Sequence, residues 1–380
     1  MYTSHFSGSR SLRHGLNLIE MAFMLASIVV LGAFGSMLAG ATRGASAEKQ
    51  SAWNLAVLAV AHNNYAMDWE GRQFSLVDDR LGEANGSLFH FHHMFGCHPA
   101  MVLGEDNDGM LWGTWLGNFD CDDEFNNGFS MNFIHNRPFN FESSINHYRA
   151  GAFRMINVRG FHKYVDGRVY SPTFYAPDSI DGKNAHEFFD DDVEYMPIPL
   201  DYDDDGVPTR PFFAYSTYMM SAAAMFDPGV FRRPSEGGWQ DPKDEYAKAY
   251  RAPAMHQARF ADLKTQMVEK DWLRGSPSRF NEDLGGRYPR LKNHWSYNHG
   301  VDASPLSLFF DGSVARINAG KATRHDAKVR QQNKGDGLWS RDTPLGDNGY
   351  LGDYAYDDRV STSHTILTTD GILGRDLINR

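Results

Sequence analysis

An uncharged segment near the N-terminus dominates the hydrophobic pattern of this chain. Residues 21–42 carry no charged side chain, and a helix of about 20 apolar residues is long enough to cross a bilayer. Beyond this segment, apolar residues continue at helical spacing without a proline. One stripe contains Leu55, Leu58, His62, Tyr65 and Trp69. We therefore expect one helix from Leu16 to near Trp69, about 80 Å long at 1.5 Å per residue, with Gly71 as its stop.

The remainder of the chain, residues 73–380, is rich in turn signals. Asp-Gly pairs occur at 108–109, 166–167, 181–182, 205–206, 311–312, 336–337 and 370–371. Glycine accepts positive φ and aspartate tolerates it, so an Asp-Gly pair between alternating apolar residues predicts a β-hairpin. Two pairs have such flanks: Asp166-Gly167 in "FHKYVDGRVYSPTF" and Asp311-Gly312 in "PLSLFFDGSVARI".

Two longer segments of this region also have a clear pattern. Residues 242–274 favour a helix that Pro253 divides. Residues 211–226 are apolar but too short and too polar to span a membrane, so we interpret them as a buried core element. The predicted fold class is α+β, with the long helix packed on an antiparallel β-sheet head that large loop insertions elaborate.

Composition narrows the range of partners. The chain of 380 residues has 42% hydrophobic and 22% charged residues, which is typical of a folded globular body. The net charge is -11 and no long basic block occurs. Nucleic acid is therefore excluded as an expected partner, because phosphate binding needs clustered positive charge.

The first 15 residues decide how the apolar segment is interpreted. They carry Arg10 and Arg13 and no acid, and positive charge before an apolar run keeps that end in the cytoplasm. One interpretation is a secretory signal cleaved after Ala45-Ser46-Ala47. Another is a plain transmembrane anchor, which leaves Glu20 unexplained, because a carboxylate at the membrane edge needs a partner.

A third interpretation gives Glu20 a partner. The residues "GLNLIE" followed by the long apolar segment resemble the class III signal of type IV pilins and type II secretion pseudopilins. The resemblance implies that a prepilin peptidase cuts after Gly15 and methylates the new N-terminus at Leu16. It makes residues 1–15 a leader, residues 16–72 a transmembrane and stalk helix, and residues 73–380 the head.

The same resemblance implies assembly into a filament through the N-terminal helix, with an inner-membrane assembly platform as a further partner. The subunit would first lie in membrane lipid with its head exported, then in a periplasmic or extracellular filament. Glu20 of one subunit would meet the cationic amine of Leu16 in a neighbour. Such a buried pair contributes little net stability but fixes register, since an unpaired buried charge is strongly penalised.

Two further stretches add to the resemblance. Residues 65–72, "YAMDWEGR", are similar to the stretch that follows the stalk in many pseudopilin-like proteins. The segment from His299 to Asp311-Gly312 resembles the His-x(9)-Asp-Gly motif of large planctomycete-type members. Here eleven residues separate His299 from Asp311, so the subfamily assignment is weaker than the pilin resemblance. His299 and Asp311 could also be acid–base partners, although a hairpin turn favours a structural role for Asp311.

Two metal sites are conceivable in the head. Asp201, Asp203 and Asp205 precede Gly206 and match the start of a calcium loop, but Phe212 stands where an EF-hand has glutamate. A Ca²⁺ site and a solvated acidic turn therefore both fit, and no cofactor is required.

A second cluster contains His90, His92, His93, Cys97 and His98, whose spacing matches no common zinc site. The alternation of Phe and His in this stretch favours a strand with one apolar face. If the head is exported, Cys97 and Cys121 can form a disulfide; in the cytosol they would be thiols.

Sequence motifs for catalysis are lacking. Neither G-x-S-x-G nor G-x-x-x-x-G-K occurs, so we expect no enzyme. The favoured function is a structural filament subunit. The alternatives are a membrane-anchored or secreted protein that binds carbohydrate or another surface, and, less favoured, an enzyme secreted after cleavage at Ala47.

Overall fold

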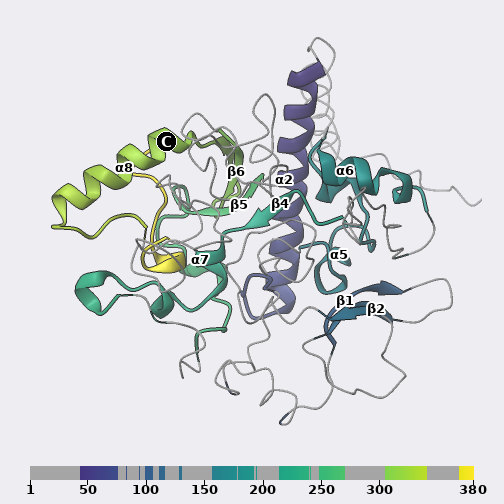
Figure 1. Cartoon of the computed structure of the whole chain (residues 1–380), viewed down its shortest axis with the longest axis horizontal. Helices are drawn as coiled ribbons and strands as arrows, with labels where there is room; N and C mark the ends of the chain where they lie inside the picture. The colour runs from purple at the N-terminus through teal and green to yellow at the C-terminus, as the bar shows by residue number, and fades with distance from the viewer. Residues whose placement is uncertain are drawn as a thin grey trace, which may run out of the picture. The chain divides into compact units, whose positions relative to one another are not determined.

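The computed structural model describes residues 43–75, 83, 94, 99–105, 111–115, 128–130, 156–177, 179–191, 194, 214–238, 240, 248–269, 304–339 and 368–380. These residues form helices and short strands (Figure 1). The α-helices are α2 (Arg43–Asp68), α5 (Arg159–His162), α6 (Ile180–Ala185), α7 (Ala222–Met225) and α8 (Ala319–Gln332). The strands are β1 (Pro99–Glu105), β2 (Leu111–Trp115), β3 (Gly128–Ser130), β4 (Tyr218–Met220), β5 (Thr265–Glu269), β6 (Leu306–Phe309) and β7 (Val314–Arg316). Short 3₁₀ helices lie at Pro172–Phe174, His186–Phe188, Pro228–Val230, Pro234–Glu236, Met255–Gln257 and Gly371–Leu373. Contacts divide the chain into two compact units, residues 1–49 and 50–380.

Helix α2 ends where the sequence predicts. Its last residue is Asp68, and Gly71 adopts a φ of 79° while its N–H donates to the Ala66 carbonyl at 2.7 Å. Glycine at this left-handed position closes the helix without a Cβ clash. Residues 16–42 of the predicted helix lie outside the described residues. Within the described part, no helix is both long and apolar enough to cross a membrane.

The central sheet has the strand order β4-β5-β6-β7, and every neighbouring pair is antiparallel. Tyr218 pairs with Glu269, and Leu308 pairs with Val314. A second sheet has the order β1-β2-β3, in which β1 and β2 are antiparallel and β2 and β3 are parallel.

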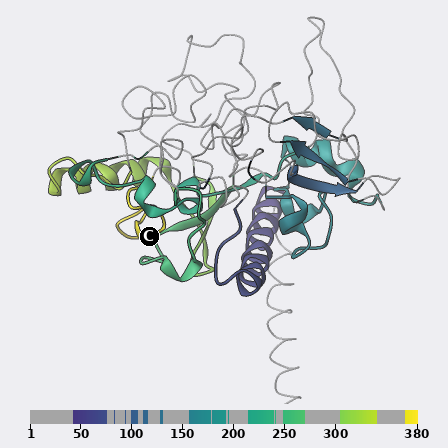
Figure 2. The same cartoon turned by 90° about the horizontal axis from the view of Figure 1, so that it is seen from below.

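Helix α2 lies between the β4–β5 side of the central sheet and the segments around α5 and α6 (Figures 1 and 2). On one side, the Ser51 hydroxyl donates to Glu269 Oε1 at 2.9 Å, and it is 2.9 Å from Tyr218 Oη. On the other side, Asn54 Nδ2 donates to the Tyr175 carbonyl at 2.9 Å. These contacts tie the helix to segments more than 100 residues away in the sequence.

The hairpin predicted at Asp311-Gly312 is confirmed. Strands β6 and β7 flank it, and Gly312 has a φ of 81°. The buried element predicted at 211–226 is confirmed for residues 214–226, which contain β4 and α7 and are all buried.

The hairpin predicted at Asp166-Gly167 is wrong. Helix α5 precedes this pair, and the N–H groups of Asp166 and Gly167 both donate to the His162 carbonyl, at 3.1 and 2.9 Å. Phe161 and His162 are adjacent and both buried, which an alternating strand would not allow. Gly167 keeps its positive φ of 83°, but here it ends a helical turn, a role that glycine fills as readily as a hairpin turn.

The helix predicted over 242–274 is also wrong for its described residues. These form a turn at 248–250, the 3₁₀ helix Met255–Gln257 and strand β5. Strand β5 pairs with β4 and β6 on its two sides, so backbone pairing with two distant segments overrides the helical pattern. Pro253 also denies the segment a continuous helix, because proline lacks the N–H that the helix needs.

A buried ion pair fastens the C-terminal segment to β5. Lys264 and Asp376 are both fully buried, with Nζ 3.2 Å from Oδ2. Lys264 also donates to the hydroxyls of Ser221 and Thr368, each at 2.8 Å. Burial acts to raise the pKa of Asp376, but the charge of Lys264 and the surrounding hydrogen bonds outweigh it and lower that pKa.

Removing one partner of this pair should destabilise the fold strongly. For Asp376→Ala we expect a loss of roughly 3–5 kcal/mol in the free energy of unfolding, because Lys264 stays buried without its counter-ion. Replacing both residues, as Lys264→Met with Asp376→Leu, should recover most of that loss. Urea unfolding of the full chain in detergent, followed by tryptophan fluorescence, measures these values. The control Asp262→Ala removes an exposed carboxylate, and an equal loss in both single variants would contradict the assignment.

Candidate functional site

Most of the site residues predicted from sequence lie outside the described residues. These are Gly15, Leu16 and Glu20 of the processing and assembly segment, Asp201, Asp203 and Asp205 of the calcium loop, Cys97 and Cys121, the histidines at 90, 92, 93 and 98, and His299. Within the described part, no group of three or more His, Cys, Asp or Glu side chains is arranged to hold a metal ion. The processing, calcium and disulfide sites therefore stay predictions, and the cluster of histidines lies outside the described residues.

Asp311 and Gly312 are the two predicted motif residues that the structure places. Asp311 Oδ1 accepts hydrogen bonds from the N–H and the hydroxyl of Ser313, at 2.9 and 2.6 Å. Arg380 lies 3.2 Å from the same oxygen and stacks its guanidinium over the Phe309 ring at 3.8 Å. Partial burial acts to raise the pKa of Asp311, but Ser313 and Arg380 together lower it. Asp311 therefore has a structural role, in the hairpin turn and in holding the C-terminal residue.

The stripe predicted along α2 is buried over most of its length. Leu55, Leu58 and His62 are fully buried, and Tyr65 packs partly buried against the same core. Trp69 differs from the prediction: it follows the last residue of the helix and is 50% exposed. Its ring stacks on Tyr65 at 5.6 Å instead of entering the core.

The opposite side of α2 carries large apolar side chains that are exposed to solvent. Trp53, Val60 and Met67 are 52%, 60% and 75% exposed. They recur every seven residues, so they follow one line along the helix, two turns apart. We call this line the α2 ridge. Single exposed apolar residues are common on proteins, but a regular row along one helix is a surface that another helix could cover.

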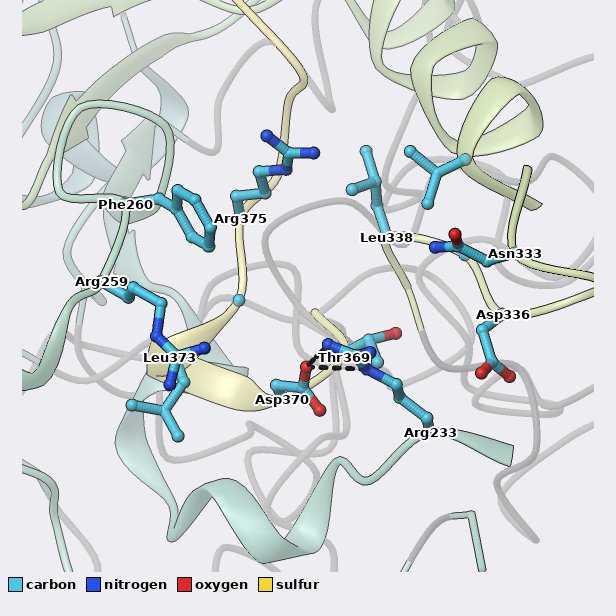
Figure 3. A pocket seen from close by; sticks show the side chains of 13 residues that line it. Arg233, Arg259, Phe260, Asn333, Asp336, Leu338, Thr369, Asp370, Leu373 and Arg375 are labelled. Atoms are coloured by element: carbon cyan, nitrogen blue, oxygen red, sulfur yellow. Dashed lines mark hydrogen bonds and ion pairs between the residues drawn. The ribbon is translucent and has the colours of Figure 1, made fainter. Parts of the chain in front are cut away.

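A polar pocket of about 170 Å³ lies beside the C-terminal segment. Figure 3 shows Arg259, Phe260, Leu373 and Arg375 on one side and Asn333, Asp336 and Leu338 on the other, with Arg233, Thr369 and Asp370 between them. The two sides are joined at the backbone, where the Thr369 N–H donates to the Leu338 carbonyl at 2.8 Å. Residues from four separate parts of the chain therefore meet here.

The charges in this pocket are only partly compensated. Arg233 donates from Nε and Nη2 to Asp370 Oδ2 at 3.0 and 2.6 Å, and this contact raises the pKa of Arg233. Asp336 accepts a hydrogen bond from Ser235 at 2.5 Å. Among the described residues, no hydrogen bond or ion pair engages the guanidinium groups of Arg259 and Arg375, although Arg375 lies 5.1 Å from the Phe260 ring.

No match to the chain was found among known protein families, curated proteins or solved structures. The function has to be argued from the residues and their geometry alone.

Sequence reasoning missed the α2 ridge and the pocket, although signals for both were present. The ridge follows the same helical pattern as the buried stripe, on the opposite side. Two of the seven Asp-Gly pairs supply Asp336 and Asp370 to the pocket. The three arginines have no shared motif, because they come from distant segments.

The buried stripe makes stability depend on pH. His62 has a pKa lowered from 6.5 to about 4, because burial disfavours its charged form. Its Nδ1 lies 3.3 Å from the Leu58 carbonyl, which only accepts hydrogen bonds, so the neutral ring is protonated there. Between pH 6.5 and 4, His62 is therefore protonated in the unfolded chain but neutral in the folded chain.

We expect the free energy of unfolding to fall by roughly 3 kcal/mol as the pH is lowered from about 6.5 to about 4, at about 1.4 kcal/mol per pH unit. His62→Leu should lose this contribution to the pH dependence. Urea unfolding of both proteins at pH 7, 6, 5 and 4 measures it. Equal slopes for the two proteins would show that His62 is not the residue responsible.

Proposed function

We propose that this protein is a structural subunit of a type IV pilus-like or type II secretion pseudopilus filament, anchored and assembled through its N-terminal helix. After removal of residues 1–15, the uncharged segment 21–42 would hold the subunit in the inner membrane before assembly. The head would lie on the exported side, and the finished filament would be periplasmic or extracellular. No catalytic step is part of this role.

The observation that carries the proposal is the α2 ridge. It lies on the helix that leads directly out of the uncharged segment 21–42. One face of α2 is buried in its own head, whereas Trp53, Val60 and Met67 remain exposed. Covering this row with a helix of a neighbouring subunit removes apolar surface from water, at roughly 25 cal/mol per Å². The ridge therefore extends to the head the same assembly surface that the uncharged segment offers in the membrane.

Register in such a filament would come from Glu20. In the proposed assembly its carboxylate meets the amine of Leu16 in a neighbour, away from water. A wrong register leaves one charge buried without a partner, which costs several kcal/mol. Within its own subunit, Glu20 lies in the first turn of the expected helix, where the helix dipole favours an anion.

The N-terminal residue of the mature protein tests this proposal most directly. We expect N-methylated Leu16 at the start of the first peptide, measured by mass spectrometry of the protein isolated from its native cell. A mature N-terminus at Glu48 would overturn the proposal, because it would release a soluble protein without the assembly segment. An intact Met1 would instead favour a plain membrane anchor.

Substitution of the α2 ridge should separate assembly from folding. In Trp53→Gln, Val60→Gln and Met67→Gln together, we expect filament yield to fall at least tenfold, because each exposed contact to a neighbour becomes polar. Each exposed substitution should change the free energy of unfolding by about 0.5 kcal/mol or less. Sedimentation of sheared filaments measures yield, and urea unfolding measures stability.

The matched control is Asn63→Gln, which changes an exposed polar residue of the same helix. Glu20→Ala serves as the positive control, with a folded head and reduced filament incorporation. A normal filament yield from the triple variant would remove the ridge from the assembly surface.

A further inference from the structure

The pocket lined by Arg233, Arg259, Asn333, Thr369 and Arg375 plays no part in the proposed assembly. It is formed by segments of the head that are far from the α2 ridge in sequence. We propose that it is a binding site for a hydroxylated monocarboxylate, namely a single hexuronate unit. This inference does not depend on the filament role, because it rests on the chemistry of the pocket alone.

The charge of the pocket selects a single negative charge. Three guanidinium groups face two carboxylates, in a chain whose net charge is -11. Asp370 pairs with Arg233, so among the described lining residues Arg259 and Arg375 can hold an anion. Planar guanidinium groups match the geometry of a carboxylate. Asp336 and Asp370 would repel a more highly charged group such as a phosphate dianion.

A buried hydroxyl without a partner also points to a polar ligand. Thr369 is 6% exposed, and its Oγ1 has no hydrogen-bond partner among the described residues. A buried hydroxyl normally finds a partner, because leaving it unpaired costs free energy. Figure 3 shows this side chain in the pocket wall, at the centre of the view next to Asp370. Together these groups can donate to and accept from the hydroxyls of a sugar.

The size and the apolar wall fit one sugar unit. The pocket has a volume of about 170 Å³, so one sugar unit is the part of a ligand that it can surround. Phe260, Leu338 and Leu373 supply apolar surface next to the charged groups. The Phe260 ring also holds Arg375 in place through a cation–π contact. Mixed apolar and polar walls of this kind are typical of small-ligand sites.

Two glycines of the pocket wall allow close approaches between neighbouring segments. A Cβ at Gly374 would lie within 2.0 Å of the Thr369 carbonyl, and a Cβ at Gly337 would lie within 2.3 Å of Asp326 Oδ1. Only glycine allows these two close approaches. These approaches hold the backbone of Thr369 and of the segment next to Leu338 in place.

Ligand-observed NMR titration of the full chain in detergent tests the site, with D-galacturonate, D-galactose and acetate as probes. We expect galacturonate to bind at least tenfold more tightly than galactose, which lacks the carboxylate, and at least tenfold more tightly than acetate, which lacks the hydroxyls. Equal binding of galactose, or no binding of galacturonate, would overturn the proposal. Equal binding of acetate would reduce the site to a bare carboxylate site and overturn the sugar assignment.

Two variants localise the binding. Arg259→Gln removes an exposed side chain that has no hydrogen-bond or ion-pair partner among the described residues, and it should weaken galacturonate binding about tenfold. The matched control Arg324→Gln removes an exposed arginine of α8 that does not line the pocket, and should leave affinity unchanged. Equal weakening by both would mean that only general charge attraction is at work.

Thr369→Val distinguishes a ligand-binding role from a structural one. Because Thr369 Oγ1 has no partner in the described fold, its removal should leave the urea midpoint unchanged or slightly raised. It should still weaken the binding of galacturonate at least threefold, since the ligand loses its proposed hydrogen bond to Thr369 Oγ1. Unchanged affinity in Thr369→Val would remove the hydroxyl from the site.

Discussion

Burial of one face of α2 is the interaction on which the rest of the described head depends. The helix presents Leu55 and Leu58 to a core that also contains β4, β5 and the segment around Phe161. Buried polar contacts then fix its position: Ser51 reaches Tyr218 and Glu269 on the sheet. Because apolar burial is not directional, these hydrogen bonds decide the register of the helix against its neighbours. The opposite face carries the exposed α2 ridge, so in the proposed filament the same helix would contact both its own head and a neighbouring subunit.

The C-terminal segment belongs to a second hydrophobic cluster, in which Leu377 packs with Phe309 of β6 and Ala322 of α8. The Lys264–Asp376 pair anchors it beside β5, and Arg380 reaches the turn at Asp311. After α8 and before Asp376, the chain turns at Asp370, whose backbone is left-handed with a φ of 64°. That turn brings Thr369 and Asp370 against Arg233 and produces the proposed sugar pocket. The contacts that hold the C-terminal segment in place therefore also form the wall of this pocket.

Local sequence signals succeeded where neighbouring residues decide the structure. Gly71 ends α2 and Gly312 turns the hairpin, because in both places a left-handed backbone is needed and glycine supplies it at no steric cost. At Gly167 the sequence correctly predicts a left-handed backbone, but the predicted hairpin is wrong. Its flanking residues form a helical turn against the core, and only packing distinguishes a helix end from a hairpin turn. Strand β5 shows the same limit, since its partners β4 and β6 come from segments about 40 residues before and after it.

The sequence by itself determined the long helical pattern, its end at Gly71, the uncharged segment with Glu20 at its start, and the hairpin at Asp311. These features depend on side-chain periodicity and on φ preferences, which act over a few residues. Only the tertiary structure decided which face of α2 is buried, that Lys264 finds Asp376, and that three arginines surround one pocket. Those outcomes depend on contacts between residues that are far apart in the chain, where no local preference carries the information.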